Sequence, residues 1–118
     1  MSNDVRKLLD LILKKVSKRK IFLHFHDTYG TAVANALCAW REYGMTGFDA
    51  SAGGLGGCPY APGASGNVAT EDLIFALKAS GAKLPVEPEK IAKAAQILSS
   101  LLDRPLASRL SSTLFPSM

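Results

Sequence analysis

The stretch KIFLHFHDTYG, residues 20–30, decides the architecture of this chain. Its first part is nearly continuous in apolar side chains and has no helical period, which predicts a short strand over Lys20–His26. Side chains alternate along a strand, so His24 and His26 point to one face and Phe25 points to the other. The polar residues after His26 mark the carboxyl end of this strand, which is the end where α/β sheets and barrels bind ligands.

The two histidines allow two interpretations. A pair of neutral imidazoles on one side of a strand end suits a divalent metal ion. The same pair could be structural, with each ring hydrogen-bonded to backbone. The spacing alone leaves both interpretations open. Asp27 and Asp49, at the ends of two predicted strands, could orient ligands or hold hydrogen bonds behind them.

Helices and strands alternate on either side of this stretch. Before it, apolar residues at helical spacing predict a helix over Asp4–Lys18. The elements predicted after it are, in order, a helix over Thr31–Tyr43 closed by Gly44, a strand over Thr46–Ala50, a glycine-rich loop over Ser51–Gly66, a helix over Val68–Ser80 ended by Gly81, a very short strand over Lys83–Val86, a helix over Pro88–Leu102 and an irregular tail over Asp103–Met118. This alternation predicts an α/β fold with about three parallel strands and flanking helices, either a small layered fold or part of a barrel.

The glycine-rich loop presents a single thiol. Because the loop follows the second predicted strand, it lies over the same end of the sheet as the histidines. A thiol flanked by glycine and proline would be accessible, which suits Cys58 to be an acid, a nucleophile or a redox-sensitive group. The alternative is a tight turn with an incidental cysteine. Neither a P-loop lysine nor a GxGxxG spacing is present in the loop.

Asn67 and Cys38 also have two interpretations each. Asn67 could cap the helix that follows it, or its amide oxygen could complete a metal site with the histidines. Cys38 lies in an apolar helical run, so we expect it in the core rather than in a reaction. A disulfide between Cys38 and Cys58 is not expected in a chain without a secretory signal.

Length, composition and charge narrow the class of protein. The 118 residues suffice for one domain, and a charged fraction of 20% is that of an ordinary soluble protein. The sequence shows no bilayer-spanning apolar run and no signal peptide, so we expect a cytosolic or organelle-matrix protein with no membrane partner. The net charge of +4 gathers near the start of the chain. This basic cluster could meet nucleic acid or coenzyme phosphates, but without interleaved aromatic residues it indicates a solvated helix end and no nucleic-acid partner.

Three segments together resemble one enzyme family. They are HFHDTYG (residues 24–30), GLGGCPYA (54–61) and GASGNVATED (63–72). These segments closely resemble the hydroxymethylglutaryl-CoA lyases, and the resemblance runs from about Ile21 to Leu102. Isopropylmalate synthases, homocitrate synthases and hydroxy-oxovalerate aldolases share an HxH-type strand but not the cysteine loop, so the assignment depends mainly on residues 56–60.

The resemblance implies a fold, a reaction and a set of site residues. It implies a TIM (β/α)8 barrel that cleaves the acyl-CoA substrate 3-hydroxy-3-methylglutaryl-CoA to acetyl-CoA and acetoacetate with a magnesium or manganese ion. By their match to the family motifs, His24, His26 and Asn67 would be the metal ligands. Cys58 would be the catalytic thiol that donates a proton to the acetyl-CoA enolate, with His24 beside it among the catalytic residues.

The start of the chain departs from the family pattern. The lyases have a metal-binding aspartate and a neighbouring arginine on an early barrel strand, and nothing in residues 1–20 matches that motif. We therefore expect the carboxyl-terminal part of an incomplete barrel, a single partial domain over 1–118. It comprises a leading helix in 1–19, lyase-like strands and helices in 20–102 and a tail over 103–118. Without a carboxylate ligand the metal site would be weak, and uncovered strand faces would favour self-association or a partner chain that supplies the missing half-barrel.

Two other functions stay open at this point. The chain could be a catalytically silent fragment that binds a metal or a partner chain without turnover. It could also be a binding module that uses its basic amino-terminal helix, which the sequence supports least. The expected location is the cytoplasm, or the mitochondrial matrix if the source is eukaryotic.

Overall fold

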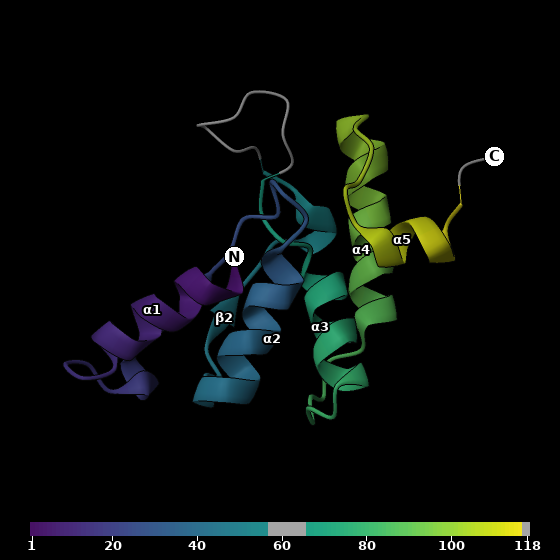
Figure 1. Cartoon of the computed structure of the whole chain (residues 1–118). Helices are drawn as coiled ribbons and strands as arrows, with labels where there is room; N and C mark the ends of the chain where they lie inside the picture. The colour runs from purple at the N-terminus through teal and green to yellow at the C-terminus, as the bar shows by residue number, and fades with distance from the viewer. Residues whose placement is uncertain (57–65, 117–118) are drawn as a thin grey trace.

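The computed structural model describes residues 1–56 and 66–116 as helices packed on a small parallel sheet (Figure 1). The elements in chain order are α1 (Ser2–Ile12), the 3-10 helix η1 (Lys18–Lys20), β1 (Leu23–His24), α2 (Ala32–Tyr43), β2 (Phe48–Asp49), the 3-10 helix η2 (Ala52–Gly54), α3 (Thr70–Ala79), α4 (Pro88–Leu102) and α5 (Arg109–Leu114). The α/β class predicted from the sequence is confirmed. None of the helices in the described ranges is long and apolar enough to cross a membrane.

The sheet consists of β1 and β2, which pair in parallel with Leu23 opposite Phe48 and His24 opposite Asp49. Both predicted strands exist, but each is shorter than the sequence indicates. A third segment continues the sheet through isolated bridges, with Asn67 against His26 and Ala69 against Ser51. The third extended segment therefore lies directly after the glycine-rich loop. The strand predicted over 83–86 is wrong, because no strand is formed there.

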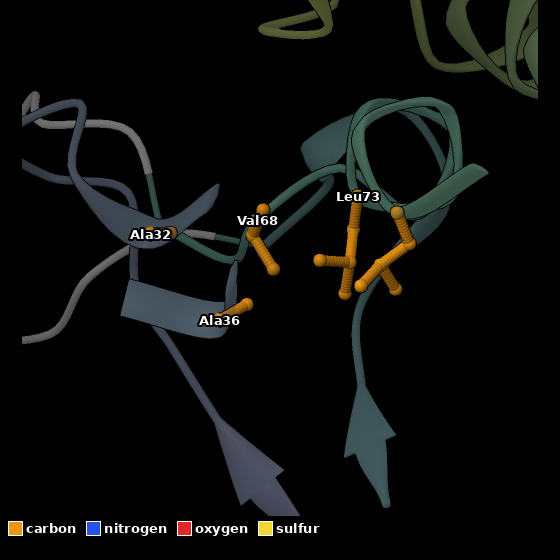
Figure 2. Packing of buried hydrophobic residues seen from close by; sticks show 5 residues of the cluster. Ala32, Ala36, Val68 and Leu73 are labelled. Atoms are coloured by element: carbon orange, nitrogen blue, oxygen red, sulfur yellow. The ribbon is translucent and has the colours of Figure 1, made fainter. Parts of the chain in front are cut away.

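Two apolar clusters hold the helices against one face of the sheet. One gathers around α2 and α3, where Val68 and Leu73 pack beside Ala32 and Ala36 (Figure 2). The other joins α1 to α2 and contains Leu9, which is 1% exposed. Leu23, Phe25 and Phe48 pack against the second cluster, so these residues mark the covered face.

A polar network reinforces the joint between α1 and α2. The guanidinium of Arg6 binds Glu42 through two nitrogens and keeps the pKa of that carboxyl below its usual value. The buried thiol of Cys38 donates to the same carboxylate, and burial raises the pKa of this thiol. Cys38 is thus a packed, free cysteine, as the sequence predicts. The hydroxyl of Tyr43 lies 2.8 Å from the carboxylate of Asp10.

Three other predictions need correction. The leading helix ends at Ile12, so the basic cluster lies beyond it in a turn and in η1 rather than in its last turn. One member of the cluster, Lys18, donates instead to the carbonyl of Tyr43 at the end of α2. The third helix begins at Thr70, later than expected. The tail is not wholly irregular, because residues 109–114 form α5, capped by the hydroxyl of Ser108.

The described residues leave the opposite face of the sheet uncovered. Phe22, on that face, leaves 72% of its surface exposed. The molecule measures 49 × 34 × 20 Å, and its radius of gyration of 14.8 Å exceeds the roughly 13.5 Å expected for a compact chain of this length. Its accessible surface is 7705 Å², against about 6200 Å² for a compact monomer of 12.5 kDa. A parallel sheet normally has both faces covered, so this face is a surface that another segment could cover.

Candidate metal centre

The strand β1 brings the two candidate histidines together on the uncovered face. The rings of His24 and His26 lie edge to face, with centroids 5.0 Å apart and an interplanar angle of 65°. His24 stands directly opposite Asp49 in the parallel register, and its Nδ1 lies 2.5 Å from a carboxylate oxygen of Asp49. An ionised carboxylate only accepts, so in the neutral imidazole the hydrogen is on Nδ1 and the lone pair is on Nε2. Asp49 thus holds His24 through a hydrogen bond, and the role of His24 as a metal ligand stays a prediction.

Asn67 lies beside His26 because the chain after the glycine-rich loop pairs with the end of β1. The flanking backbone bonds run from the N–H of Asp27 to the carbonyl of Gly66 at 2.8 Å and from Val68 to Phe25 at 3.3 Å. Interpreting Asn67 as a helix cap is wrong, since Ala69 occupies the cap position of α3. The candidate metal ligands therefore come from the end of β1 and from the segment around Asn67 that is bridged to it.

The side chain of Asn67 is held by the segment that precedes the cysteine loop. Its amide nitrogen donates to the carbonyl of Leu55 at 3.0 Å. This bond uses the nitrogen and not the amide oxygen, which is the atom that would bind a metal. Gly56 has a φ of +111°, and a Cβ at this position would lie 2.7 Å from that nitrogen. A side chain at residue 56 would push Asn67 away, so the glycine is needed for the close approach.

Asp27 has a structural task. Its carboxylate accepts from the backbone N–H of Ala32 at 3.0 Å, which stabilises the start of α2. This contact fixes the turn that follows the histidines.

Cys58 falls in residues 57–65, outside the described residues, and its role stays a prediction. On one side of that segment, Gly56 packs on the side chain of Asn67. On the other side, the carbonyl of Gly66 accepts from the N–H of Asp27.

Sequence reasoning missed a buried carboxylate behind this site. Glu71 is 0% exposed, and its two oxygens accept from the N–H of Gly53 at 2.8 and 3.1 Å. One of these oxygens also accepts from the hydroxyl of Ser111 at 3.0 Å. The neighbouring Asp72 accepts from the first backbone N–H groups of α5. In the sequence both acids look like ordinary first-turn residues, which favour a helix start whether or not they are buried.

The donors that gather here fit a divalent metal ion. Two imidazole nitrogens and one amide oxygen are neutral ligand types for a divalent ion, and the hydrogen bond that His24 donates to Asp49 orients the ring as metal-bound histidines usually are. Within residues 1–56 and 66–116, no group of three His, Cys, Asp or Glu side chains could hold a metal on its own. The site is thus an incomplete donor set without a coordinating carboxylate among the described residues.

Comparison with known proteins decides the family. A protein-family model described as HMGL-like matches residues 1–98. This chain belongs to the HMGL-like family. The hydroxymethylglutaryl-CoA lyase YngG of Bacillus subtilis is 49% identical over 105 residues, which make up 89% of this chain and 35% of that protein. The resemblance drawn from the three sequence segments is confirmed.

Solved structures agree with this assignment. The Bacillus subtilis HMG-CoA lyase superposes with a TM-score of 0.89 at 46% identity, covering 93% of this chain and 37% of that one. An HMG-CoA lyase from Acinetobacter baumannii, in complex with coenzyme A and 3-methylmalate, superposes with a TM-score of 0.85 at 37% identity, covering 95% and 36%. The chain therefore spans about a third of the length of the relatives that it matches.

Proposed function

We propose that this chain carries the histidine, asparagine and cysteine groups of a metal-dependent hydroxymethylglutaryl-CoA lyase. The observation that carries the proposal is the HxH strand end, with Asp49 behind His24 and Asn67 bridged to His26. Family membership supports it, since the relatives that match most of this chain are named as lyases of this substrate.

In this proposal His24, His26 and Asn67 hold a magnesium or manganese ion. When bound, the ion would supply Lewis-acid polarisation of the substrate's hydroxyl and carboxyl oxygens. The hydrogen bond that Nδ1 of His24 makes to Asp49 fixes the orientation of the imidazole ring, so the ring is positioned before a metal arrives. His24 counts as a catalytic residue in this sense, through direct contact with the ion.

The reaction assigned to the site breaks one carbon–carbon bond and involves two proton transfers. The substrate's hydroxyl loses its proton and becomes the ketone of acetoacetate, while the electron pair of the broken bond goes to the enolate of acetyl-CoA. Cys58 is proposed to donate its thiol proton to the enolate carbon, which yields acetyl-CoA. The hydroxyl proton passes to solvent water, and the Cys58 thiolate left by the second transfer takes a proton back from water, so no proton is gained or lost overall.

The described part of the site lacks a carboxylate ligand, and its sheet face is open. We propose that this chain is the carboxyl-terminal part of a barrel and that self-association or a partner chain covers the exposed face. Phe22 and the open side chains of His24 and Asp49, 49% and 59% exposed, support such a cover. The cytoplasm or the mitochondrial matrix stays the predicted location.

The test measures metal binding and turnover separately on the purified chain. Titration with Mn²⁺, followed by the electron paramagnetic resonance signal of the free ion, should show one weak site that His24→Ala abolishes and Arg41→Ala does not affect. Cleavage of 3-hydroxy-3-methylglutaryl-CoA with Mn²⁺ is compared with Cys58→Ala. Turnover that Cys58→Ala removes supports a working site. Mn²⁺ binding without turnover in a folded chain favours the silent-fragment alternative, and no Mn²⁺ binding at all would contradict the metal assignment.

A further inference from the structure

The segment after α4 lies outside the residues that the family model matches, yet it contacts the support of the metal site. The match ends at residue 98, and α5 begins at Arg109. Figure 1 shows α5 beside α4, reached by a chain that returns along α4 from its end. Two of its serines, Ser108 and Ser111, are 0% and 2% exposed, which is unusual for hydroxyl side chains in a terminal segment.

The first contact of this segment is with Gly53. The backbone N–H of Ala107 donates to the carbonyl of Gly53 at 3.2 Å. A Cβ on Gly53 would lie 2.7 Å from the side chain of Leu106 and 3.2 Å from Ala95, so α4 and the returning segment enclose this glycine. Gly53 also has a φ of +69°, a conformation in which other residues are strained.

The second contact runs through Glu71. Its carboxylate joins the N–H of Gly53 to the hydroxyl of Ser111, while Asp72 binds the start of α5 through Ser108 and two backbone N–H groups. A buried carboxylate needs such donors, because an unsatisfied one costs several kilocalories per mole. The helix α5 therefore supplies, through Ser111, the second donor to Glu71, the residue that binds the N–H of Gly53.

The fixed glycines in turn support Asn67. Gly54 follows Gly53 with a φ of +70°, and a Cβ there would lie 3.3 Å from the carbonyl oxygen of Asn67. Leu55 accepts from the side-chain amide of Asn67, and Gly56 packs on that amide. A continuous set of contacts thus links α5 to Asn67 without touching the metal position itself.

We propose that Glu71 and Ser111 are positioning residues, through which α5 holds the amide of Asn67 in place for the metal. This inference rests on the proposed metal site but makes a separate claim about the metal-free chain. Removing the hydroxyl of Ser111 leaves Glu71 short of one donor, so the carboxylate holds Gly53 less firmly. The loosened segment 53–56 then lets the Asn67 amide move.

The test uses Ser111→Ala with Ser112→Ala as its matched control. Ser112 lies on the same helix and donates to the carbonyl of Ser108, so its loss leaves the hydrogen bonds of Glu71 unchanged. In the metal-free chain, NMR should show shifted side-chain amide signals of Asn67 and exchange of the Gly53 N–H about tenfold or more faster, the factor for one hydrogen bond to a charged group. Mn²⁺ affinity should fall about three- to tenfold, less than the roughly tenfold or more typical of a residue bonded directly to a metal ligand.

A second variant weakens the attachment of α5 through a different contact, the one made by Asp72. Asp72→Ala releases the start of α5 and keeps both hydrogen-bond partners of Glu71, Gly53 and Ser111, and it should shift the Asn67 amide signals in the same direction. Circular dichroism establishes that each variant is folded. Unchanged Asn67 and Gly53 signals in both folded variants would overturn the inference. If the wild-type chain bound no Mn²⁺, the proposed metal site would fail, and the Asn67 signals would still decide whether α5 positions this side chain.

Discussion

The two sides of the candidate metal centre are built in opposite ways. On the histidine side, His24 and Asp49 stand on a bare sheet face and are about half exposed. On the asparagine side, Asn67 rests on a glycine segment backed by the fully buried Glu71 and by α5. Among the described residues, the asparagine side has a buried support beneath it, whereas the histidine side has strand partners but no layer above it. Changes on the asparagine side should therefore affect folding, and changes on the histidine side should affect binding only.

The largest effect is expected for Glu71→Ala. The substitution leaves the N–H of Gly53 and the hydroxyl of Ser111 buried without their acceptor, and we expect a loss of about 2–4 kcal/mol in the free energy of unfolding. Urea denaturation followed by circular dichroism measures this change. Glu89→Ala, which removes an exposed carboxylate from α4, is the control and should stay within about 0.5 kcal/mol. Equal stability of the two variants would show that the buried side does not depend on Glu71.

Gly56→Ala should be next, because it strains the backbone and displaces a side chain. Residue 56 has a φ of +111°, and the new methyl group would lie 2.7 Å from the amide of Asn67. We expect Mn²⁺ affinity to fall about tenfold and stability by about 1–2 kcal/mol. Gly81→Ala is a matched control, since Gly81 has a φ of +105° with nothing within 4 Å. It should cost similar stability and leave Mn²⁺ affinity unchanged; a loss of affinity in both variants would exclude the contact with Asn67 as the cause.

The sequence could predict the features of this molecule that depend on neighbouring residues, but not those that depend on distant ones. The strand end with its histidines, the start of α4 at Pro88 and the end of α2 at Gly44 were predictable, because alternation, proline and glycine act locally. The burial of Glu71 was not, because its partners Gly53 and Ser111 lie 18 and 40 residues away. Local patterns carry no information about such distances.

The missed strand boundaries have a related cause. Strand length depends on neighbours, and β1 and β2 pair over only two residues each. The residues around Leu84 were expected to form a strand from their composition, but in the described chain they have no strand beside them and pack against the α2–α3 cluster. The sequence pattern could indicate an extended segment but not whether a neighbour exists.

On the histidine side, Asp49→Ala should weaken metal binding and leave the fold intact. Its carboxylate fixes the ring of His24, and loss of such a partner typically lowers metal affinity about tenfold. Because Asp49 is 59% exposed, we expect the free energy of unfolding to change by less than about 0.5 kcal/mol. Mn²⁺ titration and urea denaturation of the same sample measure both quantities. A large loss of stability would show that the bare face contributes to the fold after all, and the contrast between the two sides would be lost.

The smallest effect on the site is expected for Tyr43, which lies in neither side but in the joint between α1 and α2. Burial, together with the bond to Asp10, raises the pKa of Tyr43 from 10.0 to about 12. A raised pKa means that folding favours the neutral phenol, so this contribution to stability is complete below pH 10 and is lost as the pH rises through 12. Ultraviolet titration of the phenolate, compared with Tyr43→Phe, should show the missing transition near pH 12, and Mn²⁺ affinity at neutral pH should be the same in both proteins. A transition near pH 10 in the difference between the two titrations would mean that the hydroxyl of Tyr43 is not held by Asp10. A change in affinity would mean that the α1–α2 joint is coupled to the metal centre.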